Sequence, residues 1–298
     1  MGSLLEPEFL AWLERLRVLA GRTPTSSGPG ENRSPARGRS AEFSEHRDYR
    51  PGDDFRHIDW RAWGRLDRLF LKVFVEERDR TLSILLDSSA SMGAGGPGAP
   101  EEGAKFDQAR RLAAALAWVG LGDLNRVGLG LVRDHLVQWH SPVRGRPHAL
   151  ELFRLLESAR PEGRTDLTTA FRQYAARSKS PGRVVVISDF LQPGAGIEAL
   201  RLLRYRGEEL LVVQVLHPTE LAPQAVGDLR LVDVETGSAR EVTLDARLLE
   251  AYRKSLQNLC DELSAWCHTQ RCSRILVRSD ADLQPALLQL LRRGGLVR

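Results

Sequence analysis

The chain has 298 residues, of which 42% are hydrophobic and 28% charged, a composition typical of a soluble globular protein. Its 43 lysines and arginines stand against 39 aspartates and glutamates, with the two signs interspersed, so the basic face of a nucleic-acid binder is not expected. Apolar runs stay well short of the ~20 residues of a membrane helix. The opening residues carry acidic side chains and lack the basic start of a signal peptide.

The N-terminal part of the chain divides into three segments. Leu5, Phe9, Leu13 and Leu16 recur at helical spacing, which predicts an amphipathic helix over residues 4–20 of a first segment, 1–20. We expect this helix to pack on its own domain, with docking on a partner as the alternative. The second and third segments are a flexible Gly/Pro/Ser-rich linker, 21–38, and a charged, aromatic, β-containing segment, 39–80, which we do not expect to be an independent domain.

Within the third segment, residues 69–75 alternate as a strand does. The charged residues of 47–60 are expected to form an ion-pair network, with Trp60 and Trp63 packing beneath them; a partner-binding surface is the alternative. Further on, the Gly-rich residues 93–104 predict a mobile loop.

Residues 81–298 alternate short apolar runs with helical patterns. Strands are predicted at 81–86, 127–132, 136–140, 183–188, 210–216 and 274–277. Helices are predicted at 106–121, 147–159, 167–177, 197–206, 246–269 and 283–291. A β-hairpin containing Glu235, Thr236 and Gly237 is expected within residues 229–244.

Continuous apolar strands that alternate with helices predict an α/β fold, with a doubly wound, mostly parallel sheet covered on both faces. The hairpin formed by 127–132 and 136–140 adds one antiparallel edge strand. Because crossovers between parallel strands are right-handed, we expect the strand order 3-2-1-4-5-6.

In such a sheet, ligands bind beyond the carboxyl ends of the strands, where the strand order reverses. The two strands at that point end in Asp87 and Asp189. If the chain after Asp87 is extended, Ser89 and Ser91 point to the same side as the aspartate. The loop before helix 167–177 adds Thr165. These carboxylates and hydroxyls are hard oxygen ligands, so we predict a site for Mg²⁺ or Mn²⁺ at Asp87, Ser89, Ser91, Thr165 and Asp189.

These five residues match the pattern D-x-S-x-S, then Thr, then Asp, and so resemble the metal-ion-dependent adhesion site (MIDAS) of von Willebrand factor A-type domains. The resemblance implies a von Willebrand A-like fold. It also implies a metal whose open coordination position takes a carboxylate from a binding partner.

The segment upstream carries a second resemblance. Residues 47–60, with Arg47, Tyr49-Arg50-Pro51-Gly52-Asp53-Asp54 and Ile58-Asp59-Trp60, resemble the signature of the DUF58 family, and the likeness extends over residues 4–295. This resemblance implies an adaptor that works with a MoxR-type AAA+ ATPase. Many members of the family have N-terminal membrane helices, but this chain resembles the shorter soluble type, for which we expect a cytoplasmic location. Arg164 stands where a glycine often precedes the threonine; it could weaken metal binding or grip an incoming carboxylate.

Two other classes of function stay open. A Mg²⁺-dependent phosphatase of the haloacid-dehalogenase type needs a second aspartate two residues after the first, where this chain has Ser89. A serine hydrolase needs a G-x-S-x-G elbow and a placed histidine, and neither is evident. We therefore expect no catalytic activity. The other class is a self-associating scaffold that uses the N-terminal helix and the C-terminal hairpin.

The cysteines Cys260, Cys267 and Cys272 are odd in number, which argues against a disulfide framework and favours a reducing compartment. Together with His268 they could be read as a zinc cluster. Zinc sites, however, usually begin with two cysteines separated by about two to four residues. Because Cys260 and Cys267 share a helical face, we interpret them as buried thiols.

Overall fold

The computed structural model describes residues 3–20, 41–49, 53–55, 58–66, 68–76, 81–95, 104–122, 126–192, 194–223 and 227–293. The chain forms two compact units, one of residues 26–79 and one of residues 1–25 with 80–298. The predicted linker, 21–38, and most of the predicted Gly-rich loop, 96–103, lie outside the described residues.

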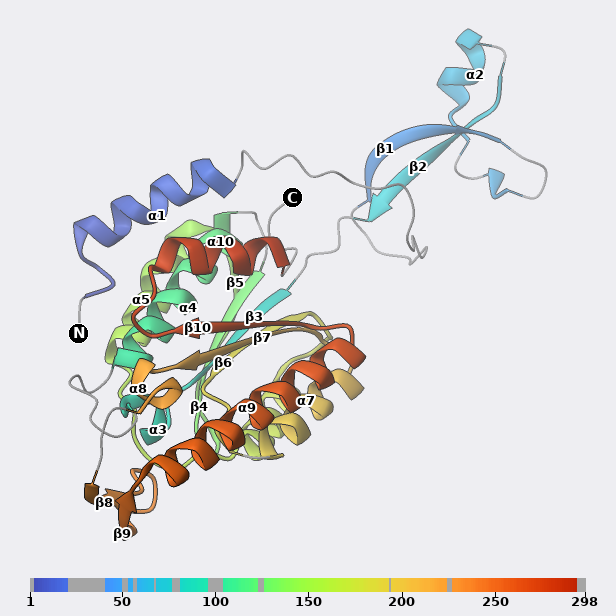
Figure 1. Ribbon diagram of the computed structural model, residues 1–298. Helices are drawn as coiled ribbons and strands as arrows, with labels where there is room; N and C mark the ends of the chain where they lie inside the picture. The colour runs from blue at the N-terminus through green and yellow to red at the C-terminus, as the bar shows by residue number, and fades with distance from the viewer. Residues whose placement is uncertain are drawn as a thin grey trace. The chain divides into compact units, whose positions relative to one another are not determined.

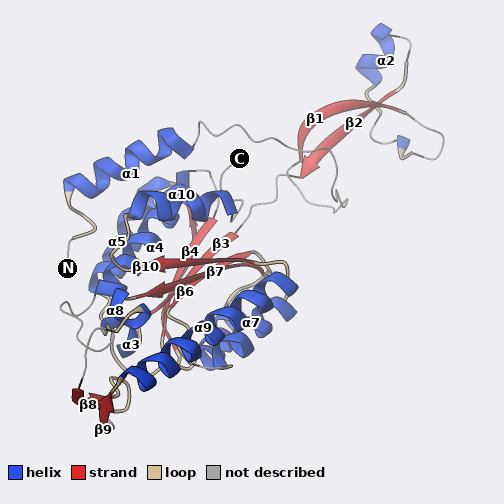
Figure 2. Ribbon diagram, viewed as in Figure 1, coloured by secondary structure: helices blue, strands red, loops and turns tan. Residues whose placement is uncertain are grey.

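The small unit is an antiparallel hairpin with a short helix. Strands β1 (Ala41–Asp48) and β2 (Phe70–Glu76) pair, and α2 (Trp60–Leu66) precedes β2 (Figure 2). The strand predicted at 69–75 is thereby confirmed.

The two tryptophans of α2 do not pack beneath a charge network. Trp60 is 60% exposed and Trp63 47% exposed, and their rings meet edge-on with centroids 6.2 Å apart. The prediction that they are covered is wrong, because two paired strands offer no second layer to bury them. Asp59 is buried and accepts a hydrogen bond from the Ala62 amide. Arg50 and Arg56 lie outside the described residues.

A six-stranded sheet forms the centre of the large unit (Figure 1). Its strands in spatial order are β10 (Ser273–Arg278), β7 (Glu209–Leu216), β6 (Arg183–Ser188), β3 (Thr81–Asp87), β4 (Arg126–Val132) and β5 (Leu136–Arg144). All neighbours are parallel except β4 and β5. In chain order this is 3-2-1-4-5-6 with an antiparallel edge, so the predicted fold class and strand order are confirmed.

Helices cover both faces of this sheet. Adjacent residues of β3 belong to opposite cores, since Ile84 packs in one apolar cluster and Leu85 in the other. The Ile84 face is covered by α1 (Pro7–Ala20), α4 (Ala104–Gly122), α5 (Ala149–Ser158) and α10 (Leu283–Arg293). The Leu85 face is covered by α6 (Leu167–Arg177), α7 (Ala195–Tyr205) and α9 (Ala246–Thr269).

The described residues also form short elements outside these layers. They are α3 (Ala90–Gly93), the 3₁₀ turn η2 (Arg146–His148), α8 (Pro218–Leu221) and the separate hairpin of β8 (Gly227–Val232) and β9 (Ala239–Leu244). The hairpin confirms the strand pair predicted within 229–244. On α9, Cys260 and Cys267 are buried, as predicted for thiols on the inner face of this helix.

Helix α1 packs on the large unit, as expected. Leu4 and Leu13 are fully buried in the same cluster as α4, and the Leu4 amide donates to Oε1 of Glu157 at 2.7 Å. The helix begins at Pro7, three residues later than predicted, since residues 4 and 5 form a turn. In the described ranges of the chain, no helix combines the length and the apolar character needed to cross a membrane.

Candidate metal site

The two predicted aspartates lie at the carboxyl ends of adjacent strands. β3 pairs with β6 in parallel, so that Leu86 stands beside Ile187 and the chains then lead into Asp87 and Asp189. Asp87 is fully buried; its Oδ2 accepts from the Ser188 hydroxyl at 2.7 Å and its Oδ1 from the Ser89 amide at 2.9 Å. Burial, together with the negative charge of Asp189, raises the pKa of Asp87 to about 6. The carboxylates are thus close enough to repel each other, as carboxylates that share a cation site are.

The two predicted serines come together, but not through an extended chain. Ser89 is extended (φ −68°, ψ 163°), whereas Ser91 lies inside helix α3. The turn between them still brings their hydroxyl oxygens to 3.0 Å. The prediction of an extended segment is therefore wrong, and the convergence of Asp87, Ser89 and Ser91 comes from a strand end followed by a helical turn.

The loop that carries Thr165 is tied to both strand ends. The Ala90 amide donates to the Gly163 carbonyl at 3.0 Å, and the Glu162 amide donates to the Ser88 carbonyl at 3.0 Å. On the other side, the Gln192 side chain donates to the Thr165 carbonyl at 3.3 Å. Thr165 therefore lies between the segment after Asp87 and the segment after Asp189, where the metal prediction requires it.

The Thr165 side chain is engaged by a residue that the sequence analysis did not select. Its hydroxyl donates to Oε1 of Glu235 at 2.6 Å, and its amide donates to Oε2 of the same carboxylate at 3.0 Å. Glu235 stands at the tip of the β8–β9 hairpin. The sequence predicts this hairpin, but nothing in its local pattern indicates that its tip reaches a residue 70 positions earlier.

A buried lysine holds the other side of the site. Lys105, in the first turn of α4, donates to Oδ2 of Asp189 and to Oε1 of Glu220, the latter in α8. Burial opposes its charge, but the carboxylates of Asp189 and Glu220 outweigh burial and raise the pKa of Lys105 above its usual value. Lys105 is not among the residues that the sequence analysis selects. The available signal was its spacing to Ala109 and Leu112, which places it on the buried stripe of α4.

The turn after Asp189 has an unusual backbone. Phe190 has φ +52°, a left-handed conformation that is rare for a bulky residue. Gly196 of α7 accommodates its ring, because a Cβ at position 196 would lie 2.8 Å from the Phe190 ring. Next to this turn, Thr165, Ser188 and Asp189 line a recess of about 10 Å³, which is room for about one water-sized sphere. Of the five predicted ligands, Thr165 and Asp189 line this recess, whereas Asp87, Ser89 and Ser91 do not.

The residues present fit a hard divalent cation. Asp87 and Asp189 supply carboxylate oxygens, and Ser89, Ser91 and Thr165 supply hydroxyl oxygens, the donors that Mg²⁺ and Mn²⁺ prefer. Within the described ranges, no group of three His, Cys, Asp or Glu side chains could hold a metal ion alone. A cation held here would therefore depend on the serine and threonine hydroxyls.

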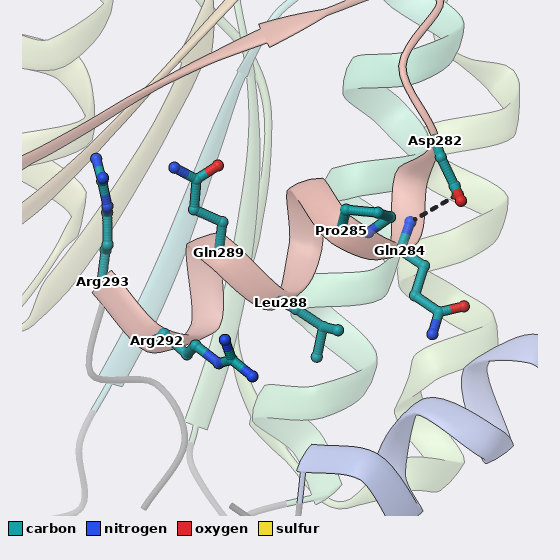
Figure 3. Close-up of a pocket in the computed structure, with 7 residues that line it drawn as sticks. All are labelled: Asp282, Gln284, Pro285, Leu288, Gln289, Arg292 and Arg293. Atoms are coloured by element: carbon teal, nitrogen blue, oxygen red, sulfur yellow. Dashed lines mark hydrogen bonds between the residues drawn. The ribbon is translucent and has the colours of Figure 1, made fainter.

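A larger hollow lies elsewhere, along one side of α10 (Figure 3). It has a volume of about 630 Å³ and is lined by Asp282, Gln284, Pro285, Leu288, Gln289, Arg292 and Arg293. All of these belong to α10 or to the residue before it, and none is among the predicted metal ligands. The hollow along α10 and the predicted metal site are therefore separate places on the large unit.

The strand order and the helices on both faces define an α/β protein with a doubly wound, mostly parallel sheet. A family model described as "Protein of unknown function DUF58" matches residues 45–259. The chain therefore belongs to the DUF58 family.

The chain is similar in sequence to uncharacterized proteins and, more distantly, to solved structures. An uncharacterized protein of Mycobacterium tuberculosis, Rv1480, is 29% identical over 99% of this chain and 93% of its own length. Among solved structures, BatB from Bacteroides thetaiotaomicron is 18% identical, with a TM-score of 0.42 over 73% of this chain and 98% of its own. The VWA domain of SpRpn10 is 14% identical, with a TM-score of 0.38 over 70% of this chain and 93% of its own.

Proposed function

We propose that this protein is a non-catalytic protein-binding adaptor. A divalent cation, Mg²⁺ or Mn²⁺, is held by Asp87, Ser89, Ser91, Thr165 and Asp189 and engages an acidic residue of a protein partner. The observation that carries the proposal is that oxygen donors from three separate loops gather at one edge of the sheet, with the Ser89 and Ser91 hydroxyls 3.0 Å apart. Such a set of carboxylate and hydroxyl oxygens is suited to a hard divalent cation, which can bridge to a further carboxylate.

The proposed partner is a MoxR-type AAA+ ATPase, which the DUF58 resemblance implies. In this arrangement the ATPase supplies the energy, and this chain, in the cytoplasm, supplies a docking surface for the ATPase or for its client. The proposal needs no transmembrane segment and no catalytic residue in this chain.

The test is capture of a purified MoxR-type ATPase by this chain, with Mg²⁺ and with EDTA. We expect capture with Mg²⁺, loss with EDTA, and loss with Ser91→Ala. The matched control is Ser88→Ala, because the Ser88 hydroxyl donates to the Val132 carbonyl at 3.3 Å and is not among the proposed ligands. Equal capture by both variants and in EDTA would exclude a metal-bridged adaptor.

A further inference from the structure

The tip of the β8–β9 hairpin makes one specific contact with the metal site. From Arg230 to Arg240 every residue is exposed except Glu235, which is part-buried. Its two carboxylate oxygens accept hydrogen bonds from the hydroxyl and the amide of Thr165. Both oxygens of one exposed-loop carboxylate are therefore committed to a single residue of the proposed ligand set.

The tip is built to present this side chain. Oδ1 of Asp233 accepts from the amides of Glu235 at 2.8 Å and Thr236 at 3.2 Å. Gly237 has φ +71°, and its amide donates to the Asp233 carbonyl at 2.8 Å. An ordered turn lowers the conformational entropy that Glu235 loses when it binds, since its backbone is already fixed.

The rest of the ribbon offers little to keep the tip in place. Leu231, Val232 and Val234 are 37%, 54% and 51% exposed, so the apolar side chains around the tip are not buried against the large unit. A two-stranded hairpin is only marginally stable on its own. The hairpin can therefore exchange its carboxylate for another one without opening the core.

The position next to Thr165 also suits an incoming acid. The backbone N–H of Glu235, the Thr236 groups and the positive charge of Arg164 hold the pKa of Asp233 below its usual value. Arg164 is exposed, so it stays available beside Thr165 when the tip leaves.

We propose that Glu235 is an internal ligand of the metal site. In the free chain its carboxylate occupies the position that a partner's carboxylate takes on binding. This inference rests on the proposed function. The partner then presents an aspartate or glutamate on an exposed turn and binds by displacing the hairpin tip. A tethered competitor lowers the apparent affinity for the partner, because the partner can bind only during the fraction of time in which Glu235 has left the site.

The test uses Mn²⁺ and a blocked peptide with the tip sequence Asp-Val-Glu-Thr-Gly, on the full chain and on Glu235→Ala. Glu241→Ala is the matched control, because Glu241 is an exposed glutamate of the same hairpin. Mn²⁺ affinity is followed by electron paramagnetic resonance, and peptide affinity by fluorescence polarisation. Urea unfolding checks that each variant is folded.

We expect Glu235→Ala to bind Mn²⁺ several-fold more weakly than the wild type. In saturating Mn²⁺ it should bind the peptide about tenfold or more tightly than the wild type, and the control should behave as the wild type in both assays. Equal Mn²⁺ and peptide affinities of wild type and Glu235→Ala would overturn the internal ligand and leave the metal site standing. Failure of every form to bind Mn²⁺ would overturn the proposed function and this inference with it.

Discussion

The ammonium nitrogen of Lys105 lies 2.9 Å from Oδ2 of Asp189 and 2.5 Å from Oε1 of Glu220, with the lysine side chain fully buried. The chain thus already places one cation, the Lys105 ammonium, beside Asp189, which is also a proposed metal ligand. Its single positive charge neutralises one negative charge, whereas the carboxylates of Asp87, Asp189 and Glu220 are all buried. The remaining negative charge is what a divalent cation would neutralise.

Removing this ammonium is expected to destabilise the protein strongly. Lys105→Met leaves Asp189 and Glu220 buried without a counter-ion, which costs about 3–5 kcal/mol. Urea unfolding at neutral pH measures the loss. Lys179→Met, at an exposed lysine, should change the free energy of unfolding by no more than about 0.5 kcal/mol. A Lys105→Met protein as stable as the wild type would show that the triad carries no net stabilisation.

The turn that positions Asp189 depends on Gly196. In Gly196→Ala the new methyl group would meet the Phe190 ring at 2.8 Å, so the turn must shift. We expect a loss of about 1–3 kcal/mol of stability, together with weaker Mn²⁺ binding. Gly64→Ala is the control, because a Cβ there meets nothing within 4 Å. If Gly196→Ala kept the Mn²⁺ affinity of the wild type, the turn geometry would not matter for the site.

Helix α1 is expected to contribute to the stability of the large unit. Leu13 is fully buried, so Leu13→Ala should cost about 2–5 kcal/mol of unfolding free energy. Leu150→Ala, at a side chain 46% exposed, should cost much less. The midpoints of urea unfolding compare the two. Similar small effects would mean that α1 is not part of this core and is available as an arm for self-association.

The three cysteines should differ in reactivity. Burial raises the pKa of Cys260, and the hydrogen bond shared with Cys272 raises that of Cys267; the same bond lowers the pKa of Cys272, which is only half-buried. A lowered pKa gives Cys272 more thiolate at neutral pH. Iodoacetamide should therefore modify Cys272 first, as read by peptide mass spectrometry. If iodoacetamide modified none of the three cysteines until a chelator was added, the result would instead support the zinc cluster.

Most of the fold follows from local patterns. The strand at 183–188 and the helices at 167–177 and 246–269 have the predicted bounds. The strand is a continuous apolar run, and each helix is strongly periodic and begins at an aspartate cap. Ser91 was misplaced in an extended segment. The four-residue helix that contains it is too short to show a period.

The site residues that the sequence missed are joined by long-range contacts. Thr165 and Glu235 are 70 positions apart, and Lys105 and Glu220 are 115 apart. No local pattern encodes which loop of a parallel sheet meets which, since that depends on strand order and loop conformation together. The five predicted ligands could be selected because they directly follow, or lie between, strands whose order the sequence does predict.

The most direct test of the account is a Mn²⁺ titration of the purified chain, followed by electron paramagnetic resonance. We predict binding of Mn²⁺ that Mg²⁺ displaces, a loss of about tenfold or more in affinity for Ser91→Ala, and no change for Ser88→Ala. A wild-type chain that binds no Mn²⁺, or a Ser91→Ala variant that binds it as the wild type does, would contradict a metal site at the carboxyl edge of this sheet.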